Sequence, residues 1–68
     1  MAVHLYGFPV DMAGLLAITR PKGIHVIEDV AEALGAKTGG ARVGGIGTIG
    51  CHSFHNKIVA SGEGGAIT

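Results

Sequence analysis

The chain has 68 residues, of which 47% are apolar, and its five basic and five acidic side chains leave no formal net charge. A balanced charge without a basic patch argues against nucleic acid as a partner, and no apolar run approaches the roughly 20 residues that cross a bilayer. The single cysteine cannot form an internal disulfide, so we expect a reducing, cytoplasmic location.

Glycine is the unusual component, because 13 of the 68 residues are glycine, whereas about 7% is usual. Glycine between apolar stretches indicates strands and tight turns where backbone segments approach closely. A chain of this length buries only about 60% of its unfolded surface, and its last residues, "GGAIT", are typical of a strand that continues. We therefore expect a piece of a larger protein.

The first elements along the chain are a strand and a helix. The stretch "VHLY" (3–6) is rich in β-branched and aromatic residues and predicts a short strand. Asp11 is a favoured N-cap residue for a helix, and Pro21 with Gly23 would end it. The apolar side of this helix would consist of Met12, Leu15, Leu16 and Thr19.

The second half of the chain predicts further strands. The continuous apolar run in "IHVIEDV" (24–30) indicates a strand that is buried on both faces. "AEALGA" (31–36) would form one helical turn that Gly35 closes. After a turn-rich stretch, "IGCHSF" (49–54) predicts a third strand, and "GGAIT" (64–68) begins a fourth.

Strand, helix and strand with short connections predict a βαβ unit of a parallel sheet, so the expected class is α/β. Ligands of such sheets bind at the carboxyl ends of the strands, where Asp29 and Ser53 fall. For Asp29 the alternative is a helix N-cap, and Glu32, three residues later, would be the other half of a capping box.

Two motifs receive a different interpretation from their usual one. "GIGTIG" (45–50) matches the dinucleotide-binding pattern, but a strand-like segment rather than a helix follows it, so we reject that function. "CHSFH" (51–55) has no second ligand pair at zinc spacing, so we predict no metal site. For His4 and His25 we favour ordinary packing in strands.

Lys57 lies between an aromatic run and "SGEGG". A lone lysine is usually solvated, and composition favours that interpretation. A reactive lysine needs a rigid, partly desolvated position so that its amine is neutral often enough to attack a carbonyl. The flanking glycines would let the backbone close around such a site.

Three blocks bear on these alternatives: "VHLYGFPVDM", "VIEDVAEALGA" with "RVGGIGTIGCHSF", and "NKIVASGEGGAIT". Together they resemble an internal segment of the sugar aminotransferases of the DegT/DnrJ/EryC1/StrS type, and "SFHNK" with "GEGG" is most similar to the perosamine synthase branch. The resemblance implies the pyridoxal 5'-phosphate (PLP) enzymes of fold type I. It makes residues 1–68 a fragment of their PLP-binding major domain, without an internal domain boundary.

The resemblance also implies roles by position. Lys57 corresponds to the lysine that bonds covalently to the cofactor, and Asp29 to the aspartate at the pyridine nitrogen. Glu32 corresponds to a position beside the cofactor ring, and Ser53 to a serine that binds the cofactor phosphate. A related branch of sugar dehydratases has histidine in place of Lys57, which argues against that branch.

The same resemblance implies glutamate as amino donor, a nucleotide-linked keto sugar as acceptor, and a homodimer at full length. Because the glycine/serine turn at the cofactor phosphate and the C-terminal domain of the family are missing from the 68 residues, we expect these residues alone to be poorly folded and inactive. A non-catalytic α/β module that binds a partner or cofactor without turnover, or a truncated remnant, is the alternative.

Overall fold

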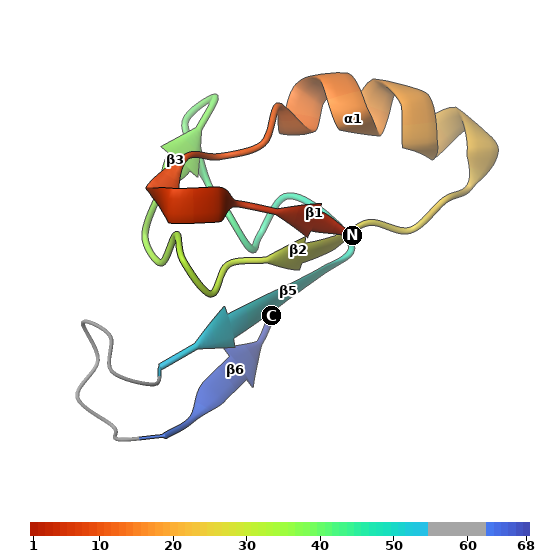
Figure 1. The fold of residues 1–68 in the computed structure, drawn as a ribbon. Coiled ribbons are helices and arrows are strands. Elements are labelled where there is room, and N and C mark those ends of the chain that lie inside the picture. Colours follow the sequence, from red (N-terminus) through yellow and green to blue (C-terminus); the bar gives the residue numbers. More distant parts are fainter. Residues whose placement is uncertain (55–62) are drawn as a thin grey trace.

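The structure, a computed structural model, describes residues 1–54 and 63–68. The main sheet in these residues has the strand order β1–β2–β5–β6, in which the first three strands are parallel and β6 is antiparallel to β5. The strands are Ala2–Val3 (β1), Ile27–Asp29 (β2), Ile49–Ser53 (β5) and Gly65–Ile67 (β6), and Figure 1 shows their arrangement. The expected α/β class with a mainly parallel sheet is therefore confirmed, as are the third and fourth strands.

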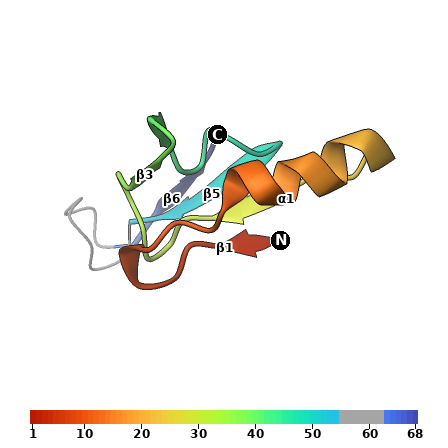
Figure 2. The ribbon, with the colours of Figure 1, turned by 90° about the horizontal axis from the view of Figure 1, so that it is seen from above.

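The helix α1 spans Met12–Thr19, as predicted. The side chain of Asp11 caps it by accepting a hydrogen bond of 3.1 Å from the backbone N–H of Gly14. A short 3₁₀ turn, η2 (Arg20–Lys22), follows the helix, and Gly23 then ends the turn in a left-handed conformation. Figure 2 shows α1 lying over the strands on one side of the sheet.

The core consists of two small clusters on the side of the sheet that α1 covers. The first cluster packs the helix against β1 and the residue before β2, and it contains Ala2, Met12, Leu16 and Val26. The second cluster lies beyond the carboxyl end of β2 and contains Val30, Ala33 and Val43. Because both clusters lie on one side, the sheet has, among residues 1–54 and 63–68, one covered face and one open face.

The expectation that residues 24–30 form a strand buried on both faces is wrong. Val26, Glu28 and Val30 point to the covered face and are buried, whereas Ile27, between them, is 38% exposed. Side chains alternate between the faces of a strand, and within the described residues only one face is covered. The open face carries apolar side chains from all four strands, namely Val3, Ile27, Ile49 and Ile67.

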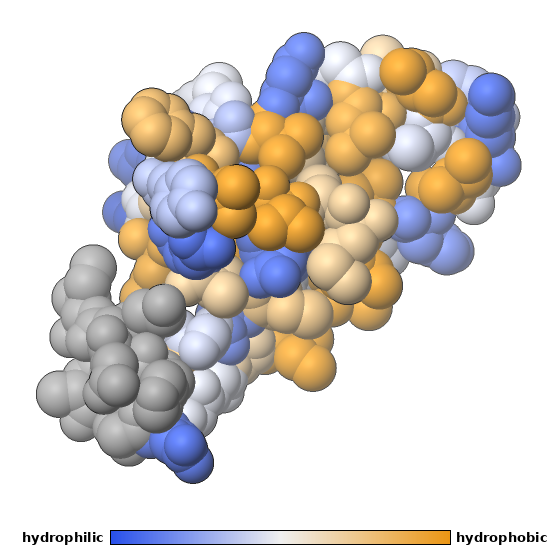
Figure 3. Space-filling view, in the orientation of Figure 1, coloured by the Kyte–Doolittle hydropathy of each residue, from blue (hydrophilic) through white to orange (hydrophobic). Residues whose placement is uncertain are grey.

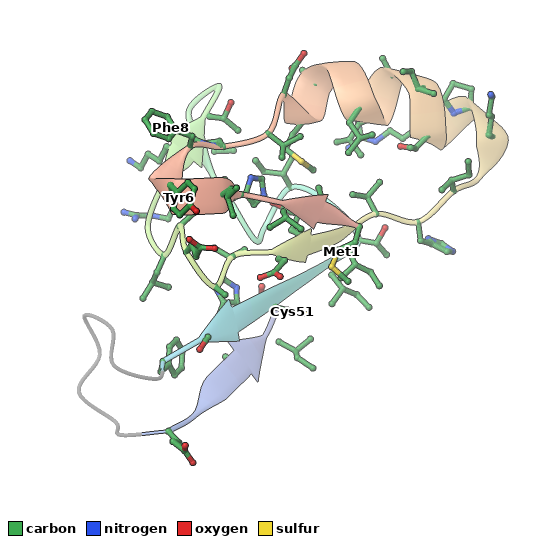
Figure 4. The ribbon with its side chains drawn as sticks, viewed as in Figure 1. Met1, Tyr6, Phe8 and Cys51 are labelled. Carbon is green, nitrogen blue, oxygen red and sulfur yellow. The ribbon has the colours of Figure 1, made fainter. Side chains whose placement is uncertain are left out.

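Many large apolar side chains are therefore exposed on the surface of the described residues. Figure 3 shows apolar groups spread over the helix and the strands, interrupted by polar side chains. Tyr6 and Phe8, which project near the carboxyl ends of the strands, are also exposed (Figure 4). In the described residues, no helix is both long and apolar enough to cross a membrane.

The strand expected over residues 3–6 is correct only at its beginning. β1 ends at Val3, and residues Leu5–Gly7 form a 3₁₀ turn, η1, in which Tyr6 has a positive φ of 53°. The backbone N–H of His4 still donates to the carbonyl of Asp29 at 3.0 Å. The chain leaves the sheet directly afterwards, and the left-handed Tyr6 is where it turns.

The helical turn expected over residues 31–36 is also wrong. Two successive turns replace it, closed by hydrogen bonds from the N–H of Ala33 to the carbonyl of Val30 and from the N–H of Ala36 to the carbonyl of Ala33. The small residues here supply the second core cluster without a helix. The glycine-rich stretch beyond it contains a hairpin of β3 (Lys37–Thr38) and β4 (Ala41–Arg42).

Candidate functional site

Two of the four candidate site residues lie in one depression on the open face of the sheet. Asp29 ends β2 and Ser53 ends β5, the neighbouring parallel strand. The depression has a volume of about 200 Å³. It is lined by Met1, Ile27, Asp29, Ala31, Cys51, His52 and Ser53.

The register of the strands explains why these two side chains meet. Asp29 pairs with Cys51 across β2 and β5, so both side chains lie on the open face. Ser53 follows Cys51 by two residues and therefore points to the same face. Figure 4 shows Cys51 on β5 beside β2. The expected position at the carboxyl edge agrees with the structure, and the chemical roles stay a prediction.

The carboxylate of Asp29 is half-buried and held in place by the backbone. Its Oδ1 accepts a hydrogen bond of 3.0 Å from the N–H of Ala31, which is the geometry of a turn stabilised by an aspartate side chain. Because residues 31–36 form turns, Asp29 does not cap a helix, and that alternative is wrong. A carboxylate fixed by its own backbone can present a negative charge to a ligand in the depression.

Glu32 lies outside this depression. It is exposed and lines a neighbouring hollow of about 600 Å³ with Gly7 and residues 31–36. The two hollows share Ala31 as a lining residue. With no helix starting after Asp29, Glu32 is also not half of a capping box. Lys57 and His55 lie outside the described residues.

The sequence interpretation missed Glu28, whose side chain takes part in four hydrogen bonds among the described residues. It is completely buried on the covered face, directly before Asp29. Its Oε1 accepts hydrogen bonds from the N–H of Ile46 at 2.8 Å and of Gly47 at 2.5 Å. Its Oε2 accepts from the N–H of Gly44 at 2.7 Å and pairs with Nε2 of His4 at 2.9 Å.

These contacts determine the charge state of Glu28. Burial by itself would raise the pKa of the carboxyl, since it disfavours the ionised form. Hydrogen bonds from the N–H groups of Gly47, Gly44 and Ile46 and from His4 outweigh burial and lower the pKa of Glu28 below its ordinary value. The side chain is therefore a buried carboxylate that stays ionised at neutral pH.

The expectation of ordinary packing in a strand is wrong for His4, which directly follows β1 and is a fully buried partner of Glu28. Its Nδ1 accepts a hydrogen bond of 3.0 Å from the N–H of Val10. The expectation is wrong for His25 as well, because this residue precedes β2 and is exposed. The alternation of "HVIEDV" was the available signal, because it places Glu28 on the same face as two valines, where a charge needs partners.

Two further motifs of the sequence lie around β5, and His55 of "CHSFH" is outside the described residues. The "GIGTIG" segment leads into the strand β5. A dinucleotide-binding motif would lead into a helix, so the structure agrees with our rejection of that function. Residues 1–54 and 63–68 contain no group of three or more histidine, cysteine, aspartate or glutamate side chains that could hold a metal ion.

Comparison with known proteins identifies the family of the chain. Residues 1–68 match the DegT/DnrJ/EryC1/StrS aminotransferase family. The chain is 48% identical to a UDP-N-acetyl-3-dehydro-alpha-D-glucosamine 3-aminotransferase of Acidithiobacillus ferrooxidans, covering 96% of this chain and 18% of the relative. It is 46% identical to the GDP-perosamine synthase of Escherichia coli O157:H7, covering 98% of this chain and 19% of the relative.

A solved structure shows the same likeness in three dimensions. An aminotransferase from Psychrobacter cryohalolentis matches with a TM-score of 0.89 and 48% identity, over 97% of this chain and 17% of that chain. The chain thus spans less than a fifth of the length of the relatives it matches. Its fold is that of one part of such an aminotransferase.

Proposed function

Because the chain belongs to the DegT/DnrJ/EryC1/StrS aminotransferase family, we propose that it supplies part of the active site of a PLP-dependent aminotransferase. The reaction moves an amino group, with glutamate as donor, to a keto group of a nucleotide-linked sugar. The named relatives support this acceptor, since one aminates a UDP-linked sugar and another makes GDP-perosamine. The full-length protein would act as a homodimer in the cytoplasm.

The observation that carries the proposal is the shared depression of Asp29 and Ser53. A pyridine nitrogen that carries a proton needs an anionic acceptor, and Asp29 presents a carboxylate fixed by Ala31. A phosphate needs hydrogen-bond donors, and Ser53 supplies a hydroxyl group on the same face. Ile27 and Met1, which also line the depression, provide apolar contact for a ring. The side chains present therefore fit PLP.

The proposed roles follow from these properties. PLP, when bound, supplies an electron sink for the carbon that exchanges its amino group. Asp29 would keep the ring nitrogen protonated, and Ser53 would hold the phosphate. Glu32, from the neighbouring hollow, would lie beside the ring. Lys57 would bond to the cofactor and move a proton at the reacting carbon of the substrate.

The test is to add PLP to the protein at its natural length, record the absorbance spectrum, reduce with borohydride and map the labelled peptide. We expect a visible absorbance band and a reduced adduct on Lys57. Lys22, which is exposed, and Lys37 are internal controls and should stay unlabelled. Asp29→Asn should weaken PLP binding while leaving the adduct position unchanged.

Two other results would count against the proposal. Adducts spread evenly over the three lysines would mean that Lys57 has no special environment. Absence of any band at millimolar PLP would instead favour the non-catalytic module. A Lys57→Arg variant separates these outcomes from nonspecific labelling, because it keeps the charge and removes the reactive amine.

A further inference from the structure

The buried carboxylate of Glu28 connects its own strand, β2, with two segments that are distant in sequence. It accepts hydrogen bonds from His4, directly after β1, and from Gly44, Ile46 and Gly47, directly before β5. A carboxylate offers about four acceptor sites. Each oxygen of Glu28 has two donors, so these sites are filled. The carboxylate lies on the covered face, opposite to the face that carries Asp29.

The ring of His4 extends this network to a fourth segment. A neutral imidazole that accepts a hydrogen bond at Nδ1 carries its proton at Nε2. Since Nδ1 of His4 accepts from Val10, its Nε2–H donates to Glu28. The segment that leads to α1 is thus tied to the same carboxylate as the turn before β5.

That turn leads directly into the ladder between β5 and β2. Behind Gly47, the N–H groups of Thr48 and Ile49 both donate to the carbonyl of Val26, and the ladder then pairs Glu28 with Gly50 and Asp29 with Cys51. A slip of one residue would move every side chain of β5 to the opposite face. Ser53 would then leave the depression that contains Asp29.

We propose that Glu28 is a positioning residue for the candidate site, and that its hold on the Gly44–Gly47 turn determines where Ser53 lies relative to Asp29. This inference rests on the proposed function, in which Asp29 and Ser53 bind the two ends of PLP. Glu28 itself faces away from the depression and touches no reacting atom.

The central test is a double-mutant cycle between Glu28→Gln and Ser53→Ala in the protein at its natural length, with the dissociation constant of PLP as the readout. The amide of Glu28→Gln keeps the shape of the side chain but turns one acceptor group into a donor, which then opposes two donors. We expect PLP affinity to fall roughly tenfold, the effect of one or two unpaired groups.

Coupling distinguishes positioning from general loss of stability. If Glu28 acts through Ser53, Glu28→Gln should have little further effect once Ser53→Ala is present. The matched control is Leu16→Ala, which damages the covered core without touching Glu28 and should combine additively with Ser53→Ala. Additive effects of Glu28→Gln, or an unchanged affinity, would overturn the proposal.

If Glu28→Gln does not fold, two conservative substitutions of His4 provide a second test. The amides of Gln and Asn both donate and accept, but they reach different places. The longer side chain of His4→Gln brings its NH2 group to the position of Nε2, where it can donate to Glu28, whereas the shorter His4→Asn brings its carbonyl to the position of Nδ1, within reach of Val10 but not of Glu28. We expect His4→Gln to retain PLP affinity and His4→Asn to lose it. The reverse order, or equal losses, would contradict the proposal.

Amide hydrogen exchange gives a readout that needs no cofactor. Glu28→Gln should speed exchange in the peptide with residues 44–53 by about tenfold or more, whereas Leu16→Ala should not do so selectively. If the unaltered protein binds no PLP, the proposed function fails, and exchange alone then decides whether Glu28 holds β5. Unchanged exchange in this peptide would refute that hold.

Discussion

The two faces of the sheet are built from the same strands but differ in what stabilises them. On the covered face, Met12 and Leu16 of α1 pack against the strands, and Glu28 receives four hydrogen bonds. On the open face, Ile27 and Ile49 are 38% and 40% exposed. Adjacent residues of β2, Glu28 and Asp29, belong to opposite faces.

This difference separates the contacts that stabilise the molecule from the groups that we propose bind its ligand. The covered face contains the helix packing and the hydrogen bonds of Glu28, and the open face contains the candidate ligand groups at the carboxyl edge. A change on the covered face should therefore affect the fold first and the site through it. A change on the open face should affect the site with little cost in folding free energy.

The largest loss in the free energy of unfolding is expected for Met12→Ala, on the covered face. Met12 is 1% exposed between helix and sheet, and truncating a buried methionine typically costs about 2–5 kcal/mol. Urea unfolding of the protein at its natural length, followed by circular dichroism, measures the change. A cost below about 1 kcal/mol would mean that α1 does not anchor the covered face.

A smaller loss is expected for Gly50→Ala. A Cβ at Gly50 would overlap the backbone of Gly44, which is buried opposite it on the covered face. Backbone cannot move aside as a flexible side chain can, so we expect a loss of about 1–3 kcal/mol. Gly23→Ala, which has open space around its Cβ but a positive φ of 65°, is the control for strain without collision.

Acidification should weaken the covered face through Glu28. Its pKa is lowered in the folded state, so its contribution is fully present above the unfolded pKa of about 4.3 and is lost as the pH falls through the lower folded value. The free energy of unfolding should therefore decrease below about pH 4.3. Glu28→Gln should lessen this decrease, and an identical pH dependence in both proteins would contradict the assignment.

The smallest effect is expected on the open face. Ile49→Thr keeps a β-branched side chain in β5 and removes one apolar group that is already partly in water. We expect the free energy of unfolding to change by at most about 1 kcal/mol. A loss as large as that of Met12→Ala would mean that another part of the protein covers this face.

The parts of the fold and of the candidate site that could be predicted from the sequence are those determined by residues close together in the chain. The helix α1 followed from Asp11 and the glycine and proline beyond it, because caps and breakers act over a few residues. The strands β5 and β6 and the parallel arrangement also followed from the sequence pattern. The position of Asp29 beside Ser53 then followed from the rule that ligands bind at the carboxyl ends of strands.

The errors arose where distant contacts decide the structure. The turns after Asp29 replace a helix because Val30 and Ala33 pack against Val43, which the local pattern does not reveal. β1 ends early, and His4, the next residue, reaches Glu28 from 24 positions away. Whether a strand is covered on one face or two also depends on neighbours that no stretch of seven residues encodes.

The turn before β5 also explains why a nucleotide-binding pattern can mislead. Loops that bind phosphate use successive backbone N–H groups to surround an anion, and the N–H groups of Gly44, Ile46 and Gly47 surround one here as well. The anion is a side chain of the protein itself, supplied by the adjacent strand. A glycine-rich loop preceded in the chain by an acidic residue within an apolar strand can thus be an internal anion receptor, already satisfied before any ligand arrives.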